Sequence, residues 1–160
     1  MQKKQYLAVL QTNGSGVLSF ATPSSGKILQ VVSASDFTER SSSSTSYVTA
    51  SNTLSLSITP SSASNKVLII ANFQAYNDLG TAVTWYTIYR NSTNLGTATG
   101  MGAYQGSNIY DTSNFTLTSY DSPATTSAIT YQVYFKVDAG TGYLGNRTPK
   151  QTITAFEIAG

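Results

Sequence analysis

Cysteine and histidine are both absent from the 160 residues of this sequence. Without them the chain can form no disulfide and lacks the commonest zinc ligands. The absence of histidine also removes the usual general base at neutral pH and excludes a Ser-His-Asp arrangement. Neither a phosphate-binding loop nor a dinucleotide-binding fingerprint occurs. We therefore expect a protein that is not an enzyme and that holds no cofactor or metal.

Charge and long apolar runs are also scarce. Charged residues make up 10% of the chain, against about 25% in an ordinary soluble domain. The nine Lys and Arg residues are scattered, without the density of a surface that follows phosphates. No apolar stretch approaches the roughly 20 residues of a membrane span. We expect neither nucleic acid nor membrane as a partner.

What the sequence does contain is a series of short strands. Apolar residues occupy every second position from Ile129 to Val137, and 53–58 and 151–159 alternate in the same way; period-two alternation is typical of a half-buried strand. The segment 66–75 is more continuously apolar and is expected at the centre of a sheet. Further strands are expected at 27–35, 83–90 and 114–120, and a brief apolar segment follows at 143–144.

The spacing of these strands indicates an all-β fold. Turn signals separate them, among them Pro60 with 61–65, and 91–96, where Gly96 is available for a positive φ. No window has the apolar stripe of a helix. We predict an antiparallel β-sandwich, jelly-roll-like, over residues 27–160. Because the last strand is as apolar as a buried one, we expect it to be paired inside a sheet.

Residues 1–26 differ from the rest and form a short N-terminal arm. Glycine- and serine-rich stretches at 13–16 and 23–26 surround two small apolar patches that the arm cannot bury by itself. We interpret the arm as an attachment or intersubunit segment; an extra edge strand on the same sandwich explains it equally well. The candidate contact residues are Tyr6, Leu7, Val9, Leu10, Val17, Leu18 and Phe20.

The seven acidic residues suggest no catalytic pair. A glycosidase needs two carboxylates that face one bond, and no two stand out here. We expect Glu157 to face solvent, since it lies on an alternating strand between Ala155 and Ala159. Oxygen atoms around Asp111 and Asn114 could hold calcium, although an ordinary Asx-turn accounts for them better.

The eleven tyrosines are the most unusual feature of the composition. Tyrosine on an alternating strand is more often a core or interface residue than a ligand contact, which is our expectation for Tyr86, Tyr89, Tyr131 and Tyr134. Tyrosine in a loop can also contact a glycan or receptor. We place three tyrosines in loops, where the two roles are evenly balanced: Tyr104, Tyr110 and Tyr143.

Several segments resemble bacteriophage virion proteins, especially the fibre-like proteins of marine and cyanobacterial phages. The longest is NTLSLSITPSSASNKVLI at 52–69, and shorter ones are QTNGSGVLSFA at 11–21, GKILQVV at 26–32, TIYRNSTNLG at 87–96 and TITAFEIA at 152–159. The resemblance is weak between 97 and 126. It implies a non-enzymatic structural protein of a phage particle, built as a trimeric β-sandwich.

The position on the particle is a separate question. Only about 26 residues precede the sandwich, and even fully extended they reach no more than roughly 90 Å. This reach suits a grip on a neighbouring shell subunit better than a distal fibre. We therefore expect a homotrimeric capsid decoration (cement) protein, anchored by its arm to the major capsid protein or another virion protein. The alternative is a receptor-binding tail fibre or tail tip that contacts host surface glycan; a depolymerase is a third, less supported, reading.

Overall fold

The computed structural model describes residues 9–12, 15, 18–21, 26–106, 112–145 and 150–160. Within these residues the chain forms thirteen strands and no helix, so the predicted all-β fold is confirmed. Two strands, β1 (Val9–Thr12) and β2 (Leu18–Ala21), pair with each other in a two-stranded sheet. The other eleven strands make two larger antiparallel sheets.

The first large sheet is built around the long central strand β6. Strand β13 lies between β3 and β6, and β10 pairs with the other edge of β6. The short strands β12 and β4 continue the sheet beyond the end of β13. The bounds are β3 (Ile28–Asp36), β4 (Arg40–Ser42), β6 (Lys66–Asn77), β10 (Ser113–Asp121), β12 (Gly142–Leu144) and β13 (Gln151–Ile158).

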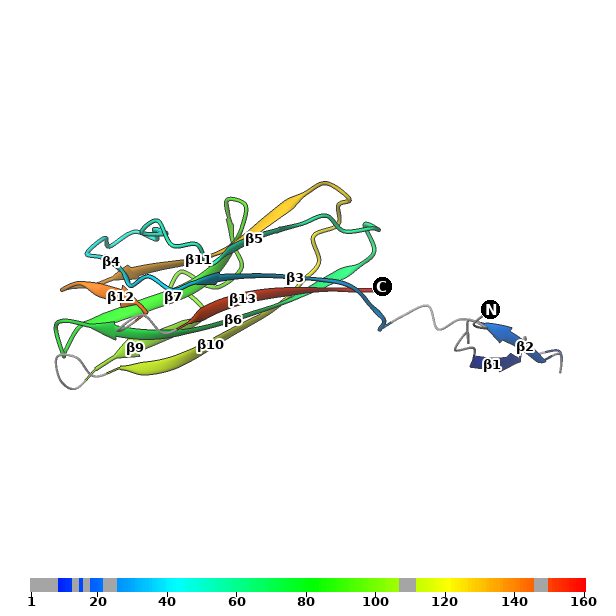
Figure 1. The fold of residues 1–160 in the computed structure, drawn as a ribbon, viewed down its shortest axis with the longest axis horizontal. Coiled ribbons are helices and arrows are strands. Elements are labelled where there is room, and N and C mark those ends of the chain that lie inside the picture. The colour runs from blue at the N-terminus through cyan, green and yellow to red at the C-terminus, as the bar shows by residue number, and fades with distance from the viewer. Residues whose placement is uncertain (1–8, 13–14, 16–17, 22–25, 107–111, 146–149) are drawn as a thin grey trace.

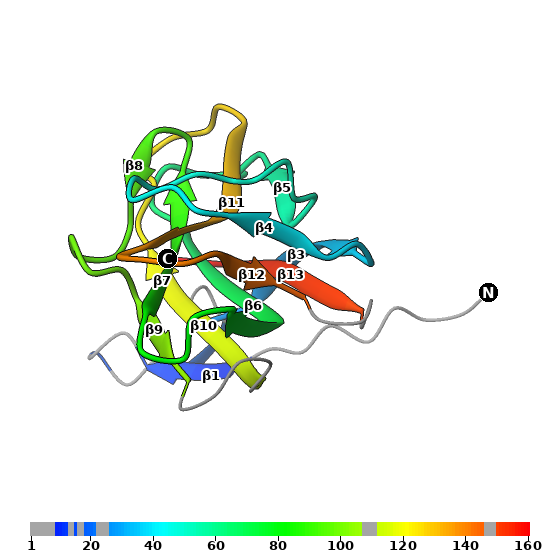
Figure 2. The same cartoon turned by 90° about the vertical axis from the view of Figure 1, so that its left-hand side faces the viewer.

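The second large sheet has the order β5-β11-β7, with β9 and β8 along the outer edge of β7. Viewed from the end, the two sheets form the two layers of a sandwich (Figure 2). The bounds are β5 (Ser55–Ile58), β7 (Val83–Arg90), β8 (Thr93–Asn94), β9 (Gly102–Gln105) and β11 (Ile129–Val137).

The pairing of the eight principal strands is that of a jelly roll. In chain order these strands are β3, β5, β6, β7, β9, β10, β11 and β13. Numbered one to eight, they have the order 1-8-3-6 in the first sheet and 2-7-4-5 in the second. Apart from the fourth and fifth, β7 and β9, which pair with each other, successive strands therefore cross between the sheets. The first and last lie side by side, as in two Greek keys folded together. As predicted, β6 is central and β13 is paired on both edges.

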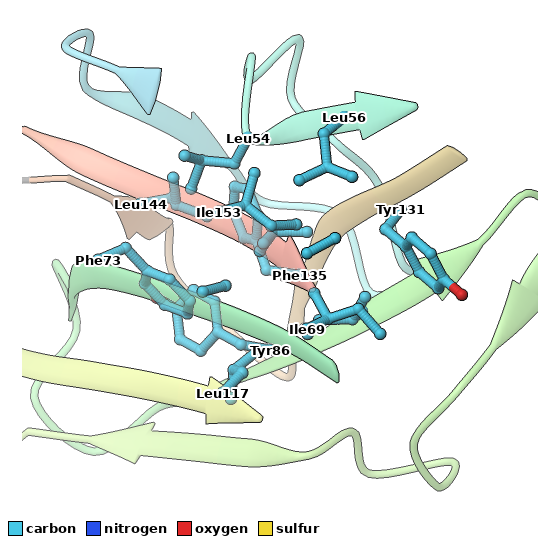
Figure 3. Packing of buried hydrophobic residues seen from close by; sticks show 14 of the residues in the cluster. Leu54, Leu56, Ile69, Phe73, Tyr86, Leu117, Tyr131, Phe135, Leu144 and Ile153 are labelled. Carbon is cyan, nitrogen blue, oxygen red and sulfur yellow. The ribbon is translucent and has the colours of Figure 1, made fainter. Parts of the chain in front are cut away.

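The core lies between the two large sheets and consists mainly of apolar side chains. Inward-facing residues alternate along β11, where every odd position from 129 to 137 is buried. Large side chains from both layers interdigitate, and Figure 3 shows Phe135 and Tyr86 of the second sheet against Ile153 and Phe73 of the first. The rings of Phe73 and Tyr86 are 5.0 Å apart between centroids. Among the described residues this core is filled mainly by apolar side chains, at the close packing that is usual for protein interiors.

Gly96 is expected from the sequence to supply a positive φ angle, and this expectation is wrong. In this hairpin the positive φ angles belong to Asn91, at 52°, and Gly100, at 78°. Gly96 is needed because the chain folds tightly there: a Cβ at this position would be 2.7 Å from both Met101 Cγ and Thr87 Oγ1. A close approach of backbone to its surroundings requires glycine as firmly as an unusual dihedral angle does.

Candidate assembly surfaces

The β1–β2 hairpin is the part of the predicted arm that the structure describes. Its strands pair in antiparallel register, with Leu10 opposite Phe20 and Thr12 opposite Leu18. Among the described residues neither strand joins either large sheet, and Figure 1 shows the hairpin beyond the end of the sandwich where the C-terminus lies. Val9 is also in β1. Three predicted contact residues, Tyr6, Leu7 and Val17, lie outside the described residues.

The three tyrosines assigned to loops are placed differently. Tyr104 lies in β9 rather than in a loop, and its side chain is only 4% exposed. It therefore offers no surface to a glycan in this conformation. Tyr143 lies in β12, half-buried, with its ring stacked on that of Tyr76 at 4.1 Å between centroids. Tyr110 lies outside the described residues.

The outer face of the first sheet carries an apolar patch that the alternation alone does not reveal. Strand register places Val31 of β3 opposite Phe156 of β13, Phe156 opposite Leu68 of β6, and Leu68 opposite Tyr120 of β10. These four side chains therefore form one row across four strands. Val31 and Tyr120, at its two ends, are 54% and 62% exposed.

Apolar residues continue from this row toward the end of the sheet where the chain enters β3. Ile158 pairs with Ile28, whose side chain is 54% exposed, and Ile70 lies one row further in the opposite direction. We call these seven residues the outer patch: Ile28, Val31, Leu68, Ile70, Tyr120, Phe156 and Ile158.

The next rows of the same face are polar. Next to the outer patch, Ser33 pairs with Thr154, and Ile70 pairs with Thr118; the following row is Ser35, Thr152, Asn72 and Thr116. A shallow depression of about 190 Å³ lies at this polar end, lined in part by Gln74, Asn114 and Lys150. On this face of the sheet the outer patch thus adjoins rows that are rich in hydroxyl and amide groups.

The outer face of the second sheet carries a half-buried aromatic group. Tyr89 and Tyr134 stack with ring centroids 4.1 Å apart, and Tyr47 meets Tyr89 edge-on at 6.1 Å. The ammonium of Lys136 lies 4.8 Å from the centre of the Tyr47 ring and 5.3 Å from that of Trp85. As expected, Tyr86 and Tyr131 are core residues, whereas Tyr89 and Tyr134 stack on each other at this outer face.

The acidic residues serve the fold. Asp121 accepts two hydrogen bonds from Arg90, at 2.9 and 3.0 Å, and one from the Tyr131 hydroxyl at 2.6 Å, which ties β10 to the second sheet. Asp36 accepts hydrogen bonds from the backbone N–H groups of Thr38 and Thr53. Asp78 and Asp138 likewise accept hydrogen bonds from backbone N–H groups across turns. Each of these four carboxylates is thus engaged in hydrogen bonds that join separate parts of the fold.

The expectation that Glu157 faces solvent is wrong. Its side chain is 1% exposed and points inward with Ile153 and Ala155. It accepts hydrogen bonds from Asn65 Nδ2 at 2.6 Å, from Gln30 Nε2 at 2.7 Å, and from the backbone N–H and hydroxyl of Ser61 at 2.6 and 2.8 Å. No cation is involved, so four neutral donors hold one buried carboxylate.

This network controls the protonation of Glu157. Burial by itself would raise the pKa of the carboxyl group, because it penalises the charged form. The hydrogen bonds from Asn65, Gln30 and Ser61 stabilise the charged form and outweigh that penalty. The pKa falls from 4.5 to about 2.

The described part of the chain contains no group of three or more acidic, His or Cys residues that could hold a metal ion. Asn114 of the suggested calcium site is exposed on β10, and Asp111 lies outside the described residues. In the same described part there is also no helix long and apolar enough to cross a membrane.

Comparison with known proteins gives structural neighbours only. No protein-family model matches the chain, and no curated protein matches it significantly. Among solved structures it is similar to a mutant VP2 protein of infectious bursal disease virus from derived T=1 particles, with a TM-score of 0.47 and 12% identity over 92% of this chain. A VP2 subviral particle of the same virus gives a TM-score of 0.47 and 10% identity, also over 92% of this chain.

This chain covers 40% and 43% of those two VP2 chains, about two fifths of their length. Identity and TM-score are both too low for the likeness to carry an argument about function. The jelly-roll topology rests instead on the strand order and register of the two large sheets.

Proposed function

We propose that this chain is a non-enzymatic structural protein of a bacteriophage particle, a capsid decoration protein that is anchored to the shell through residues 1–26 and assembles as a homotrimer. The observation that carries the proposal is the N-terminal hairpin. It forms a sheet of its own and pairs with no strand of the jelly roll among the described residues. A segment of this kind is available to a neighbouring protein.

The fold is compatible with this role without requiring it. Eight-stranded jelly rolls occur in viral capsid proteins, lectins and cupins, and fold alone does not determine function. A cupin-like metal enzyme needs ligands inside the sandwich, whereas the core here is apolar and the buried carboxylates are taken up by structural hydrogen bonds. A protein that packs between others needs a rigid body and contact faces, and both are present.

Trimeric attachment would compensate for a weak individual contact. A hairpin of this size can bury only a limited area, and one copy alone would dissociate readily. Three arms on one rigid trimer raise the effective concentration of the second and third contacts into the millimolar range. The sandwich also carries few charged residues, so it makes few electrostatic contacts with other molecules that would compete with attachment to the shell. Salt screens the contacts that do form.

Removing residues 2–20 is expected to abolish binding to phage heads that lack this protein. The deletion takes away β1 and all of β2 except Ala21, and it leaves every strand of the sandwich. Binding is measured by co-sedimentation of the purified protein with heads, and retention of the β circular-dichroism spectrum shows that the sandwich still folds. In the full-length chain, Phe20→Asp is the matched single change, with Ser19→Asp as its control. If the truncated protein coats heads as the intact one does, residues 1–26 are not the anchor.

A receptor-binding tail protein is the second candidate, and the Tyr76–Tyr143 stack favours it. Tyr143 is partly exposed, and its ring is held in place by Tyr76, which is how a protein presents a rigid aromatic surface to a sugar at little entropic cost. This candidate requires the isolated protein to bind host cells, and Tyr143→Ala to reduce that binding.

A further inference from the structure

We propose that the outer patch is the surface through which one copy of this chain binds a second copy in the trimer. The inference rests on the proposed function, because it identifies the subunit interface of the proposed homotrimer. It depends on the register of four strands, on the absence of charge from the patch, and on where the N-terminal segment leaves the sandwich.

The patch is continuous because register forces its members together. Residues directly opposite each other on neighbouring strands have Cβ atoms about 5 Å apart. Val31, Phe156, Leu68 and Tyr120 are linked by three such pairings, and Ile158 with Ile28 lies in the adjacent row. The two ends of the row are more than half exposed, so the patch reaches both edges of the four-strand layer.

The size of the patch suits the centre of a protein interface. With about 4.8 Å between strands and about 6.7 Å between successive rows on one face, its seven residues cover roughly 220 Å² in projection. A standard interface takes about 800 Å² from each partner, with an apolar centre and a polar rim. On the same outer face, the row that follows Val31 and Tyr120 provides such a rim; it contains Ser33, Thr154 and Thr118.

The adjoining edge strand β3 carries few of the usual protections against association in its first half, apart from the irregular register opposite Glu157 and Ile158. Exposed edge strands usually carry Lys, Pro or an inward charge that prevents further pairing. Strand β3 contains neither Lys nor Pro, and its one charged residue, Asp36, is buried at the far end. Ile28, Leu29 and Val31 in its first half are all exposed.

A second copy is the partner that the remaining features favour. Lys66, which pairs with Ile158, is the one charged residue among the outward positions of the patch rows, so the surface offers little by which a partner of opposite charge could be selected. The N-terminal segment joins the sandwich at the border of the patch. There the Gly26 N–H donates to the Ala159 carbonyl at 3.1 Å, and the Ala159 N–H donates to the Lys27 carbonyl at 2.9 Å.

Each copy therefore carries an exposed apolar patch on the outer face of its first sheet, while the β1–β2 hairpin remains for the proposed contact with the shell. An arrangement in which each copy contacts the next through different surfaces closes into a ring when the rotation permits. Three copies give the trimer, with the patch of each subunit covered by its neighbour.

The test is the mass of the full-length protein in solution, measured by light scattering across micromolar concentrations. The wild-type chain should give three times the 17.0 kDa of one copy. Val31→Lys and Tyr120→Lys, each changing an exposed side chain, should raise the concentration at which the trimer half-dissociates by about tenfold or more, because a charge would be buried unpaired at the interface. Unchanged thermal unfolding of the monomeric form shows that the fold is intact.

Ser33→Lys and Thr118→Lys are the matched controls. Each lies two positions along the same strand, on the same face but outside the patch, and should change the half-dissociation concentration by no more than about twofold. A trimer that survives both patch substitutions would overturn this inference and leave the homotrimer standing. A wild-type monomer would overturn both the inference and the trimer, while binding to phage heads would still report separately on the proposed virion role.

Discussion

Replacing Glu157 by glutamine is expected to lower the free energy of unfolding at pH 7 by about 3 kcal/mol. The carboxylate accepts hydrogen bonds from Asn65, Gln30 and Ser61 in a site from which water is excluded. Glutamine would bring an NH₂ group toward these donors and would leave at least one of them without an acceptor. Urea unfolding followed by circular dichroism measures the change, with the exposed Glu39→Gln as the control, for which a change below about 0.5 kcal/mol is expected.

The same substitution should alter the dependence of stability on pH. The folded-state pKa of Glu157, about 2, is below the unfolded value of 4.5, so the carboxylate stabilises the fold above the unfolded pKa. That contribution is lost as pH falls from about 5 toward 2. The pKa of Asp36 is also lowered: burial would raise it, but hydrogen bonds from Thr53, Thr38 and Arg40 prevail. At pH 3 the difference between wild type and Glu157→Gln should shrink by about half or more; a difference that does not depend on pH would mean that the carboxylate is not ionised in this network.

Phe135→Ala is expected to cost about 3–5 kcal/mol, enough to unfold much of a protein of ordinary stability. Phe135 is fully buried on the central strand β11, with its ring 5.8 Å from that of Tyr86, and the strands around it cannot collapse into the space left by the ring. Phe135→Leu keeps most of the volume and should cost less than half as much. Both values come from urea unfolding; equal costs for the two variants would show that ring volume is not what matters at this position.

Strands whose residues alternate could be predicted from the sequence almost to the residue. The segment Ile129 to Val137 is β11 with the predicted bounds, and the alternating segment 151–159 contains β13. Alternation predicts these strands because one face of each strand is buried, and this burial fixes the face of the sheet on which each side chain lies. Short strands could not be found in this way. Strand β9 has only four residues, the first of which is Gly102, too few to establish a period, and its formation depends on pairing with β7. For that reason the sequence alone places Tyr104 in a loop.

The surfaces were harder to predict because they depend on pairing between distant strands. The row from Val31 to Tyr120 requires the register of β3, β13, β6 and β10, and no periodicity within one strand reveals which residues of another lie opposite. The buried environment of Glu157 is hard to predict for the same reason, since its hydrogen-bond donor Asn65 is 92 residues away in sequence. A signal was nevertheless present: Glu157 shares the period of Ile153 and Ala155, and 61–65 is rich in potential donors.

Immunogold labelling of intact phage particles, with antibody raised against this chain, tests the central claim most directly. A decoration protein present in many copies on the shell should give label over the whole head and little on the tail. Label restricted to the tail would contradict the decoration role and favour the receptor-binding candidate. Absence of label from particles that otherwise stain well would contradict the claim that this chain is a structural protein of the virion.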